Sequence, residues 1–443
     1  MKINLLLTDK CFLIVLLLTI VLLLRGLRKE HIRRALQAIF KKPVPMCSAI
    51  ILLFFLIIGV IDSIHVRTEA KSLSILDQIL SPLGDVYEKT YSEPLALTLY
   101  SSETWFNDGQ AIQVYPRLNY IPSFISDENE KLQIIKAVIK KSSIMTALIV
   151  ISLLFSFIIF KLIFFGKRKS FIGLTGFSAF ITIAICIFTI LFSYWLSRYF
   201  HILGTGKIGQ DIFYYAVKSI RTGLIIGILT TLFMMPLALL LGIAAGYFGG
   251  IVDDIIQYIY TTLSSIPGVL LITASVLAMQ TYIANHPQQF KTLEENADAR
   301  LFALCLILGI TSWTSLCRLL RAEALKLKEI DYVLAAKALG SSSYKIITKH
   351  LLPNVMHIVV ITLVLDFSFL VLAEAVLSYV GVGVSPMTIS WGNMINAARL
   401  ELARDPIIWW PMLAAFVFMF ILVLASNLFA DAVRDAFDPH QIK

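Results

Sequence analysis

The sequence predicts an all-α, polytopic membrane protein. Of its residues, 58% are hydrophobic and 15% are charged, and the mean hydropathy is +0.81. This composition is too apolar for a soluble globular protein, and apolar segments long enough to cross a bilayer recur along the chain. The formal net charge of +9 is not read as a nucleic-acid signal, because surplus Lys and Arg in membrane proteins collect in cytoplasmic loops and report orientation.

The five cysteines lie within or at the ends of apolar segments, and no CxxC or His/Cys cluster occurs. This pattern predicts neither a disulfide framework nor a zinc site. We therefore expect the cysteines to serve packing and the chain to hold no metal.

The first apolar run, Cys11 to Leu24, reaches the ~20 residues of a spanning helix only if it begins near Ile3. The alternative is a cleaved signal peptide, which needs a basic start and a small-residue cleavage site. Instead the basic stretch Arg25 to Lys42 follows, with seven Lys/Arg and one Glu, which is typical of a cytoplasmic loop. We expect a true span with an extracytoplasmic N-terminus.

Residues 1–170 are predicted to form an extension with about three membrane helices. After a second span at Pro45–Ile64, polar residues dominate positions 66–143, with helix-like spacing over Glu69–Tyr87 and Asp127–Lys141. This extracytoplasmic segment is either a platform for a solute-binding partner or a spacer. Ile144–Phe165 returns as a third span, to the basic turn Gly166–Lys169.

Six further spans follow. They are expected at Phe171–Phe200, Ser219–Tyr247, Ile255–Tyr282, Leu301–Leu320, Asn354–Val380 and Ile407–Phe429. Alternation from a cytoplasmic basic turn at 167–169 places both Arg321–Leu352 and the C-terminal tail Asp431–Lys443 in the cytoplasm.

Residues 321–353 form a long polar, lysine-rich interruption in the apolar C-terminal half. Good helix formers predict a short helix from Ala322 to Leu339, which Gly340 ends by taking the left-handed conformation. Ser341 or Ser342 then caps a second short helix, and Pro353 fits the first turn of the next one. The stretch is either an ordinary helical loop or a projecting two-helix structure suited to docking a partner.

The sequence pattern of this stretch is specific for one kind of loop. Ala335-Ala336, three residues, Gly340, nine residues and then His350-x-Leu352-Pro353 resembles the EAA loop of binding-protein-dependent ABC importers, with the pattern E-A-A-x3-G-x9-I-x-L-P. Leu334 and His350 depart from that pattern. The sequence from Tyr332 to Gly340 is similar to the corresponding sequence in the dipeptide/oligopeptide/nickel permease branch, whose members often lack the Glu.

The resemblance extends from Phe171 to the C-terminus. Segments similar to that branch occur in order at 203–211, 245–250, 377–383, 390–393 and 434–439. In the first of these, Gly206 and Gln210 stand where the branch has Asp and Arg. The resemblance implies a six-helix permease core over residues 171–443, with a coupling loop at 321–353 that contains Ala335, Ala336, Gly340, Leu352 and Pro353.

The resemblance also implies function and partners. It implies an ABC importer in a bacterial inner membrane, carrying peptides, or alternatively nickel or another small solute. The implied partners are ATPase subunits, a second homologous permease, a solute-binding protein and the lipid bilayer, and no nucleic acid is expected. Neither Gly166-Lys167 nor Gly206-Lys207 belongs to a Walker A sequence. We therefore expect no enzyme activity and no bound cofactor in this chain, with ATP and Mg used by the partner ATPase.

Two acidic residues fall inside a predicted span, where ionisable groups are expensive and therefore informative. Asp366 and Glu374 lie eight positions apart, on nearly the same face of one helix. They either form structural bonds to neighbouring helices or line the translocation path, and Glu374 is the better candidate for the path because it precedes the segment at 377–383. Two other classes remain open: an ion-coupled secondary transporter, and a membrane enzyme, for which no polar cluster is found.

Overall fold

The computed structural model describes residues 2–3, 5–28, 30–67, 72–107, 110–165, 173–286 and 292–437. The basic turn Gly166–Lys169 and the end of the C-terminal tail lie outside these ranges. The chain divides into two compact units. The first contains residues 1–4, 37–221 and 389–425, and the second contains residues 5–36, 222–388 and 426–443. This division follows packing and does not test the predicted boundary at residue 170.

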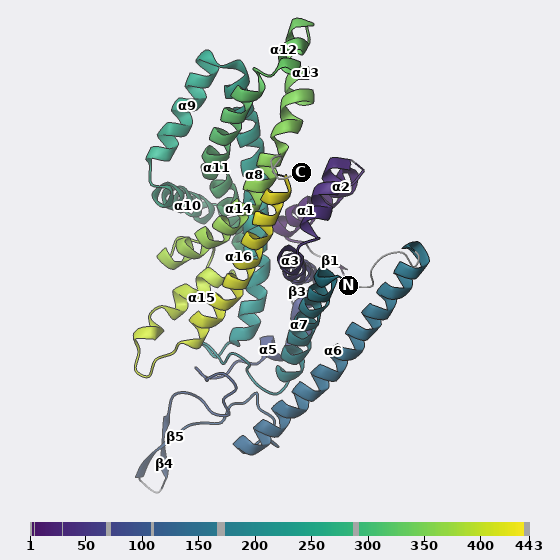
Figure 1. Cartoon of the computed structure of the whole chain (residues 1–443). Helices are drawn as coiled ribbons and strands as arrows, with labels where there is room; N and C mark the ends of the chain where they lie inside the picture. The colour runs from purple at the N-terminus through teal and green to yellow at the C-terminus, as the bar shows by residue number, and fades with distance from the viewer. Residues whose placement is uncertain are drawn as a thin grey trace. The chain divides into compact units, whose positions relative to one another are not determined.

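Nine helices in the described part of the chain are long and apolar enough to cross a membrane. They are α1 (Leu7–Gly26), α3 (Pro43–Ser63), α6 (Glu128–Phe165), α7 (Leu174–Leu196), α8 (Ile212–Phe248), α10 (Gly268–Asn285), α11 (Leu293–Leu327), the continuous stretch from α13 (Ser343–Ile346) to α14 (Leu352–Val380), and α16 (Trp410–Phe437). Each corresponds to one predicted span (Figure 1). The all-α, polytopic prediction is confirmed.

One span was predicted as a single helix but consists of two. The segment predicted as a single helix, Ile255–Tyr282, is divided into α9 (Gly250–Ser265) and α10, with a break at Ile266 and Pro267. Ile266 has an extended backbone, with φ −86° and ψ 131°, because the residue before a proline avoids the α region. The sequence contained this signal in Pro267.

The first unit contains the polar segment, residues 66–143, which is less helical than predicted. Its elements, with the strands that pair with it, are β1 (Lys2–Ile3), β2 (His65–Arg67), β3 (Ser72–Ser74), α4 (Ile75–Ile79), α5 (Ser81–Asp85), β4 (Glu103–Asn107) and β5 (Gln110–Val114). The short helix α2 (Glu30–Ile39) lies between α1 and α3. Strands β1, β2 and β3 form one antiparallel sheet, and β4 pairs with β5 as a hairpin. The helix predicted at Asp127–Lys141 exists, but it is the first part of the 38-residue helix α6.

An apolar core fixes the polar segment to the ends of two long helices. Leu118, Ile121 and Ile125 are buried against Val138 of α6 and Phe200 just after α7. These side chains are at most 5% exposed. The segment is therefore part of the folded unit and not a free tether.

The second unit is built on α8, α11 and α14, which pack with the short helices α12 (Asp331–Ala338) and α13. Helix α1 also belongs to this unit. The backbone N–H of Thr8 donates to a carboxylate oxygen of Asp298 on α11 at 3.1 Å, and the Thr8 hydroxyl donates to the other oxygen. Asp298 thus pairs an N–H in the first turn of α1 that the helix itself leaves unbonded. The remaining elements are α15 (Trp391–Ala398) and η4 (Glu401–Ala403), both in the first unit.

Candidate functional site

The stretch that resembles the EAA loop folds as a two-helix knob, defined here as α12, the turn at Gly340 and α13 (Figure 1). The predicted start of its first helix at Ala322 is wrong. Helix α11 continues to Leu327, because Ala324 and Leu327 are buried in the core of the unit and no helix breaker precedes them. A turn at 328–330 then leads into α12, and Gly340 follows with φ +76°.

The second half of the knob also differs from the prediction. Ser342 takes the N-cap position, but its side chain makes no capping hydrogen bond. Helix α13 continues without a break through a π-helical turn, Ile347–Leu351, into α14. Pro353 lies in the first turn of α14, as predicted, directly after this turn. A π-turn is one of the ways a helix accommodates a proline that cannot donate to the preceding turn.

The knob has a buried face and an exposed tip. Val333 and Ile346 of the knob, and Leu351 in the π-helical turn that follows it, are at most 2% exposed. They belong to the apolar core that joins α8, α11 and α14. In contrast, Leu339 is 85% exposed and Tyr344 is 79% exposed. The knob is therefore fixed to the membrane helices by one side while it presents apolar side chains on the other.

The remaining predicted loop residues fall on both sides of this division. Ala336 and Leu352 pack against the buried core, whereas Ala335 and Pro353 are exposed. Gly340 is in the open, because a Cβ added there would meet no atom within 4 Å.

A group of hydrogen bonds that was not predicted from the sequence connects α12 to the start of α14. The side-chain amide of Asn354 donates to the Tyr332 hydroxyl at 2.8 Å and to the His350 carbonyl at 2.7 Å. The rings of Tyr332 and His350 lie 5.9 Å apart. His350, which departs from the family pattern, thus packs beside α12. The i, i+4 spacing of His350 and Asn354 was the one sequence signal available.

Helix α9 is linked to the same end of α11 by a bidentate ion pair. The Arg321 guanidinium donates to both carboxylate oxygens of Asp253, at 2.5 and 2.6 Å. These hydrogen bonds hold the pKa of Asp253 below its usual range. The planar fork of arginine gives this contact a fixed geometry, so α9 and α11 are oriented relative to each other where the knob begins.

The two acidic residues of α14 have different surroundings. Glu374, the favoured candidate from sequence, is 3% exposed and accepts a hydrogen bond from the Ser378 hydroxyl at 2.7 Å. Asp366 lines a cavity of about 280 Å³ with residues of α8 and α11. The geometry therefore favours Asp366 as the path residue, and a path role for either acid stays a prediction.

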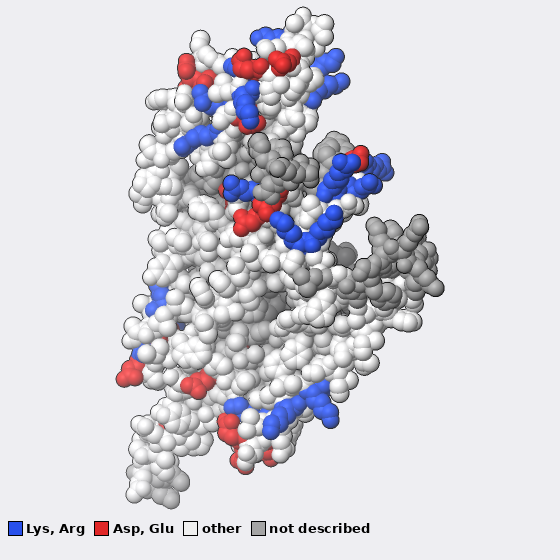
Figure 2. Space-filling view, viewed as in Figure 1, with Lys and Arg blue, Asp and Glu red and all other residues white. Residues whose placement is uncertain are grey.

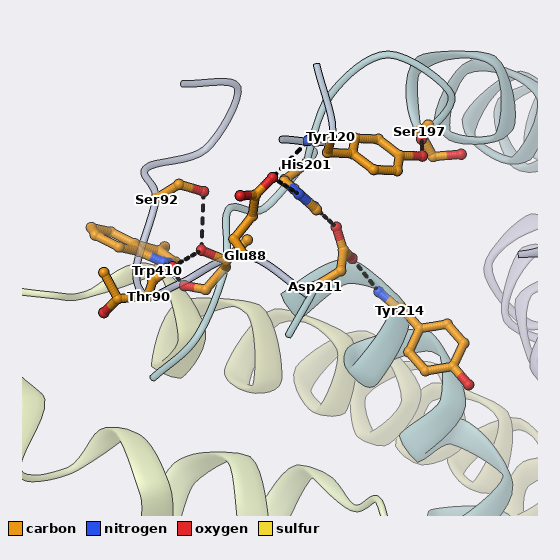
Figure 3. Close-up of polar contacts among 10 residues, drawn as sticks. Glu88, Thr90, Ser92, Tyr120, Ser197, His201, Asp211, Tyr214 and Trp410 are labelled. Atoms are coloured by element: carbon orange, nitrogen blue, oxygen red, sulfur yellow. Dashed lines mark hydrogen bonds and ion pairs between the residues drawn. The ribbon is translucent and has the colours of Figure 1, made fainter. Parts of the chain in front are cut away.

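A turn, residues 201–211, leads into α8 in the first unit and contains a segment that resembles the permease branch (Figure 3). Gly209 has φ +76°, and its carbonyl accepts from the Glu88 N–H at 3.0 Å. A Cβ at this position would lie 1.8 Å from the Glu88 carbonyl oxygen. The turn is thus closed directly against the polar segment.

An ionic triad joins the same two pieces of chain. His201 Nδ1 lies 2.6 Å from Asp211 Oδ2, and His201 Nε2 lies 3.8 Å from Glu88 Oε1, an ion-pair distance. The Glu88 carboxylate also accepts the backbone N–H groups of Asn119 and Tyr120, at 3.0 and 2.7 Å (Figure 3). All three members of the triad are at most 5% exposed.

The triad holds a positive charge on the imidazole. Burial by itself lowers the pKa of His201, but the hydrogen bond with Asp211 and the charges of Asp211 and Glu88 outweigh burial and raise that pKa to about 9. An unperturbed histidine has a pKa of about 6.5. His201 is therefore an imidazolium at neutral pH, and the stability it provides is present at neutral pH and lost as the pH rises through 9.

Comparison with known proteins decides the family. Residues 238–443 match the model of the binding-protein-dependent transport system inner membrane component. The glutathione transport system permease protein of Pectobacterium atrosepticum is 32% identical over 240 residues, which are 54% of this chain and 72% of that protein. This chain belongs to the family of inner membrane components of binding-protein-dependent transport systems.

Two further relatives of this permease family carry peptide names. The dipeptide transport system permease protein of Lactococcus lactis is 32% identical over 239 residues, 54% of this chain and 64% of that protein. The oligopeptide transport system permease protein of Mycobacterium bovis is 30% identical over 239 residues, 54% of this chain and 76% of that protein. The family resemblance seen in the sequence is confirmed, and the family model includes the knob and both acids of α14.

Proposed function

We propose that this chain is the transmembrane permease subunit of an ATP-driven ABC importer for peptides. The observation that supports this most strongly is the knob, which combines a buried face with an exposed apolar tip. An ATPase subunit binds that tip, uses ATP and Mg, and works with a second homologous permease and a solute-binding protein. The chain lies in the bacterial inner membrane with the knob and the C-terminus in the cytoplasm.

The knob provides a mechanical route from the ATPase to the membrane helices. Its buried residues Val333 and Ile346 share one apolar core with α8, α11 and α14. Because packed interiors transmit displacement with little compression, a movement of the tip moves the ends of these helices. Figure 2 shows charged side chains over the helix end that carries the knob, as expected for a cytoplasmic end.

The same helices reach the cavity that contains Asp366. From Pro353 to Asp366 the chain advances 13 residues along α14, or roughly 20 Å at 1.5 Å per residue. Met234 of α8 and Ser312 of α11 line the cavity from the other two helices. The proposed ATPase stroke would therefore act on the walls of a membrane cavity. The relatives' names support peptides as the substrate.

Purification of the tagged chain in mild detergent from its native membrane tests this proposal. A P-loop ATPase and a second permease are expected to co-purify with the wild type. In the Leu339→Asp variant the ATPase should be lost while the protein stays folded, because Leu339 is 85% exposed. The matched control is Leu293→Asp, since Leu293 is 75% exposed in the first turn of α11, far along the chain from the knob.

Two results would contradict the proposal. One is the absence of any nucleotide-hydrolysing partner together with solute uptake by the isolated chain, which would favour a secondary transporter. The other is equal retention of the ATPase by Leu339→Asp and Leu293→Asp, which would place the docking surface elsewhere.

A further inference from the structure

A membrane cavity in the second unit is lined by both polar and apolar side chains. Its volume is about 280 Å³, several times the ~30 Å³ that one water molecule occupies in the liquid. Three helices line it. The lining residues are Met234 from α8, Ser312, Thr314 and Ser315 from α11, and Asp366, Phe369 and Leu370 from α14.

The polar groups of this cavity are not used by the chain itself. Within the described residues, the side chains of Asp366, Ser312, Thr314 and Ser315 form no hydrogen bond or ion pair with another protein group. A carboxylate in a spanning helix is costly unless it is paired. Glu374, on the same helix, shows the usual solution, since it bonds to Ser378.

We propose that this cavity is a subsite for a primary ammonium group, with Asp366 as its counter-ion. Ammonium has three donors and no acceptor, which matches a cavity lined by a carboxylate and by hydroxyl groups. Phe369 lines the same cavity, and an aromatic ring attracts a nearby cation. Met234 and Leu370 provide an apolar wall for the adjoining carbon atoms.

This inference rests on the proposed function, because the terminal ammonium of a peptide is the cationic group in question. It assigns a polarity to the bound peptide, with the amino end held between α11 and α14. It also explains why an acid is placed in the middle of α14, where packing alone would favour an apolar residue.

A chemical protection experiment tests the subsite without measuring transport. The purified complex is treated with dicyclohexylcarbodiimide, an apolar reagent for carboxyl groups, and the adduct at Asp366 is measured by mass spectrometry. L-alanyl-L-alanine should prevent the modification of Asp366, while its N-acetyl derivative, which has no ammonium group, should not. Glu374 is the internal control, since it is buried and bonded to Ser378, and neither dipeptide should alter its modification.

The proposal is overturned if Asp366 is not modified without peptide, if both dipeptides protect it, or if neither does. The first result would mean that the carboxyl is closed to small molecules. The second would mean that the cavity does not recognise the ammonium group, and the third that it does not bind the dipeptide.

Variants supply the second measurement. Asp366→Asn should lower uptake of L-alanyl-L-alanine by the assembled complex roughly ten- to hundredfold, the range expected for one lost charge-assisted hydrogen bond. Asp366→Glu keeps the charge and should recover most of the uptake. Wild-type uptake in Asp366→Asn, or no recovery in Asp366→Glu, would count against the subsite. Failure of the proposed function is distinct, because the wild-type complex would then show no ATP-dependent uptake at all.

Discussion

Two turns in this molecule contain a glycine with the same backbone angle and opposite surroundings. Gly209 and Gly340 both have φ +76°. A Cβ at Gly209 would lie 1.8 Å from the Glu88 carbonyl oxygen, whereas a Cβ at Gly340 would meet nothing within 4 Å. The first turn is completed by the chain's own polar segment. The second leaves an open surface, which is what a docking site for another protein requires.

The side chains around the two glycines also differ in charge and exposure. Around Gly209, the charged groups of His201, Asp211 and Glu88 are buried, and both acids lie within ion-pair distance of His201. Around Gly340, Leu339 and Tyr344 are exposed and apolar. The turn at Gly209 holds the fold together, and the knob is available to a partner. Four predictions test whether the two turns differ in this way.

The largest effect is expected from Asp211→Ala. This change leaves the His201 charge buried with only Glu88 near it, and it removes the oxygen that accepts the Tyr214 N–H at 2.8 Å in the first turn of α8. Breaking a buried pair in this way destabilises a protein by about 3–5 kcal/mol. The loss of stability is measured by thermal unfolding of the purified protein. Limited proteolysis within residues 66–143 shows whether the polar segment is released.

The control for this prediction is Glu103→Ala in the same segment. Glu103 pairs with Lys89 at 3.0 Å in an exposed ion pair, and such pairs add little to stability. Equal effects of Asp211→Ala and Glu103→Ala would show that the triad does not hold the segment.

The second prediction compares Gly209→Ala with Gly340→Ala. Both require the left-handed region, at a cost of about 1–2 kcal/mol, but only Gly209→Ala adds a clash with backbone, for which overpacking costs about 1–3 kcal/mol. The melting temperature should fall clearly more for Gly209→Ala, with a combined loss of about 2–5 kcal/mol. Equal falls would mean that the two turns do not differ as described.

The third prediction concerns coupling. Gly340→Val places a β-branched residue in the left-handed region and should distort the tip by about 1–2 kcal/mol of backbone strain, so ATP-dependent uptake should drop severalfold with the chain still folded. Gly340→Asn is the matched control, because asparagine tolerates this conformation. Wild-type uptake and ATPase stimulation in Gly340→Val would remove the coupling role.

The smallest effect is a pH dependence. Because the pKa of His201 is raised to about 9, the folded state keeps a proton that the unfolded state releases above pH ~6.5. Stability should therefore decline between pH 7 and 9, by at most about 1.4 kcal/mol per pH unit. The slope of melting temperature against pH should flatten in His201→Gln, and an unchanged slope there would assign the dependence to another group.

Much of the fold could be predicted because a helix that crosses a bilayer requires a long run of apolar residues. The apolar run counted from Cys11 was too short for a span, but the helix begins earlier and Leu7–Gly26 is a candidate span. Its first turn is bonded to α11 through Thr8 and Asp298. Helix ends were harder. The prediction ended a span at Leu320, but Ala324 and Leu327 continue it, because their burial depends on residues distant in the sequence.

The candidate site was only partly legible in the sequence. The knob was found from Ala335, Ala336 and Gly340, since a helix end needs a local turn signal. The triad was not found, because Glu88 and His201 are 113 positions apart in the sequence and no local pattern joins them. Likewise, sequence could place Asp366 and Glu374 on one face of a helix, but not decide which of them had a partner.

Photocrosslinking can show whether an ATPase binds the exposed tip of the knob. Leu339 is replaced by the photoreactive residue benzoylphenylalanine in cells, and Phe124, which is 61% exposed in the polar segment, is replaced in the same way as the control. Illumination should join a P-loop ATPase to position 339 and not to position 124. An adduct at 339 that contains no ATPase, or equal ATPase capture at both positions, would contradict the account.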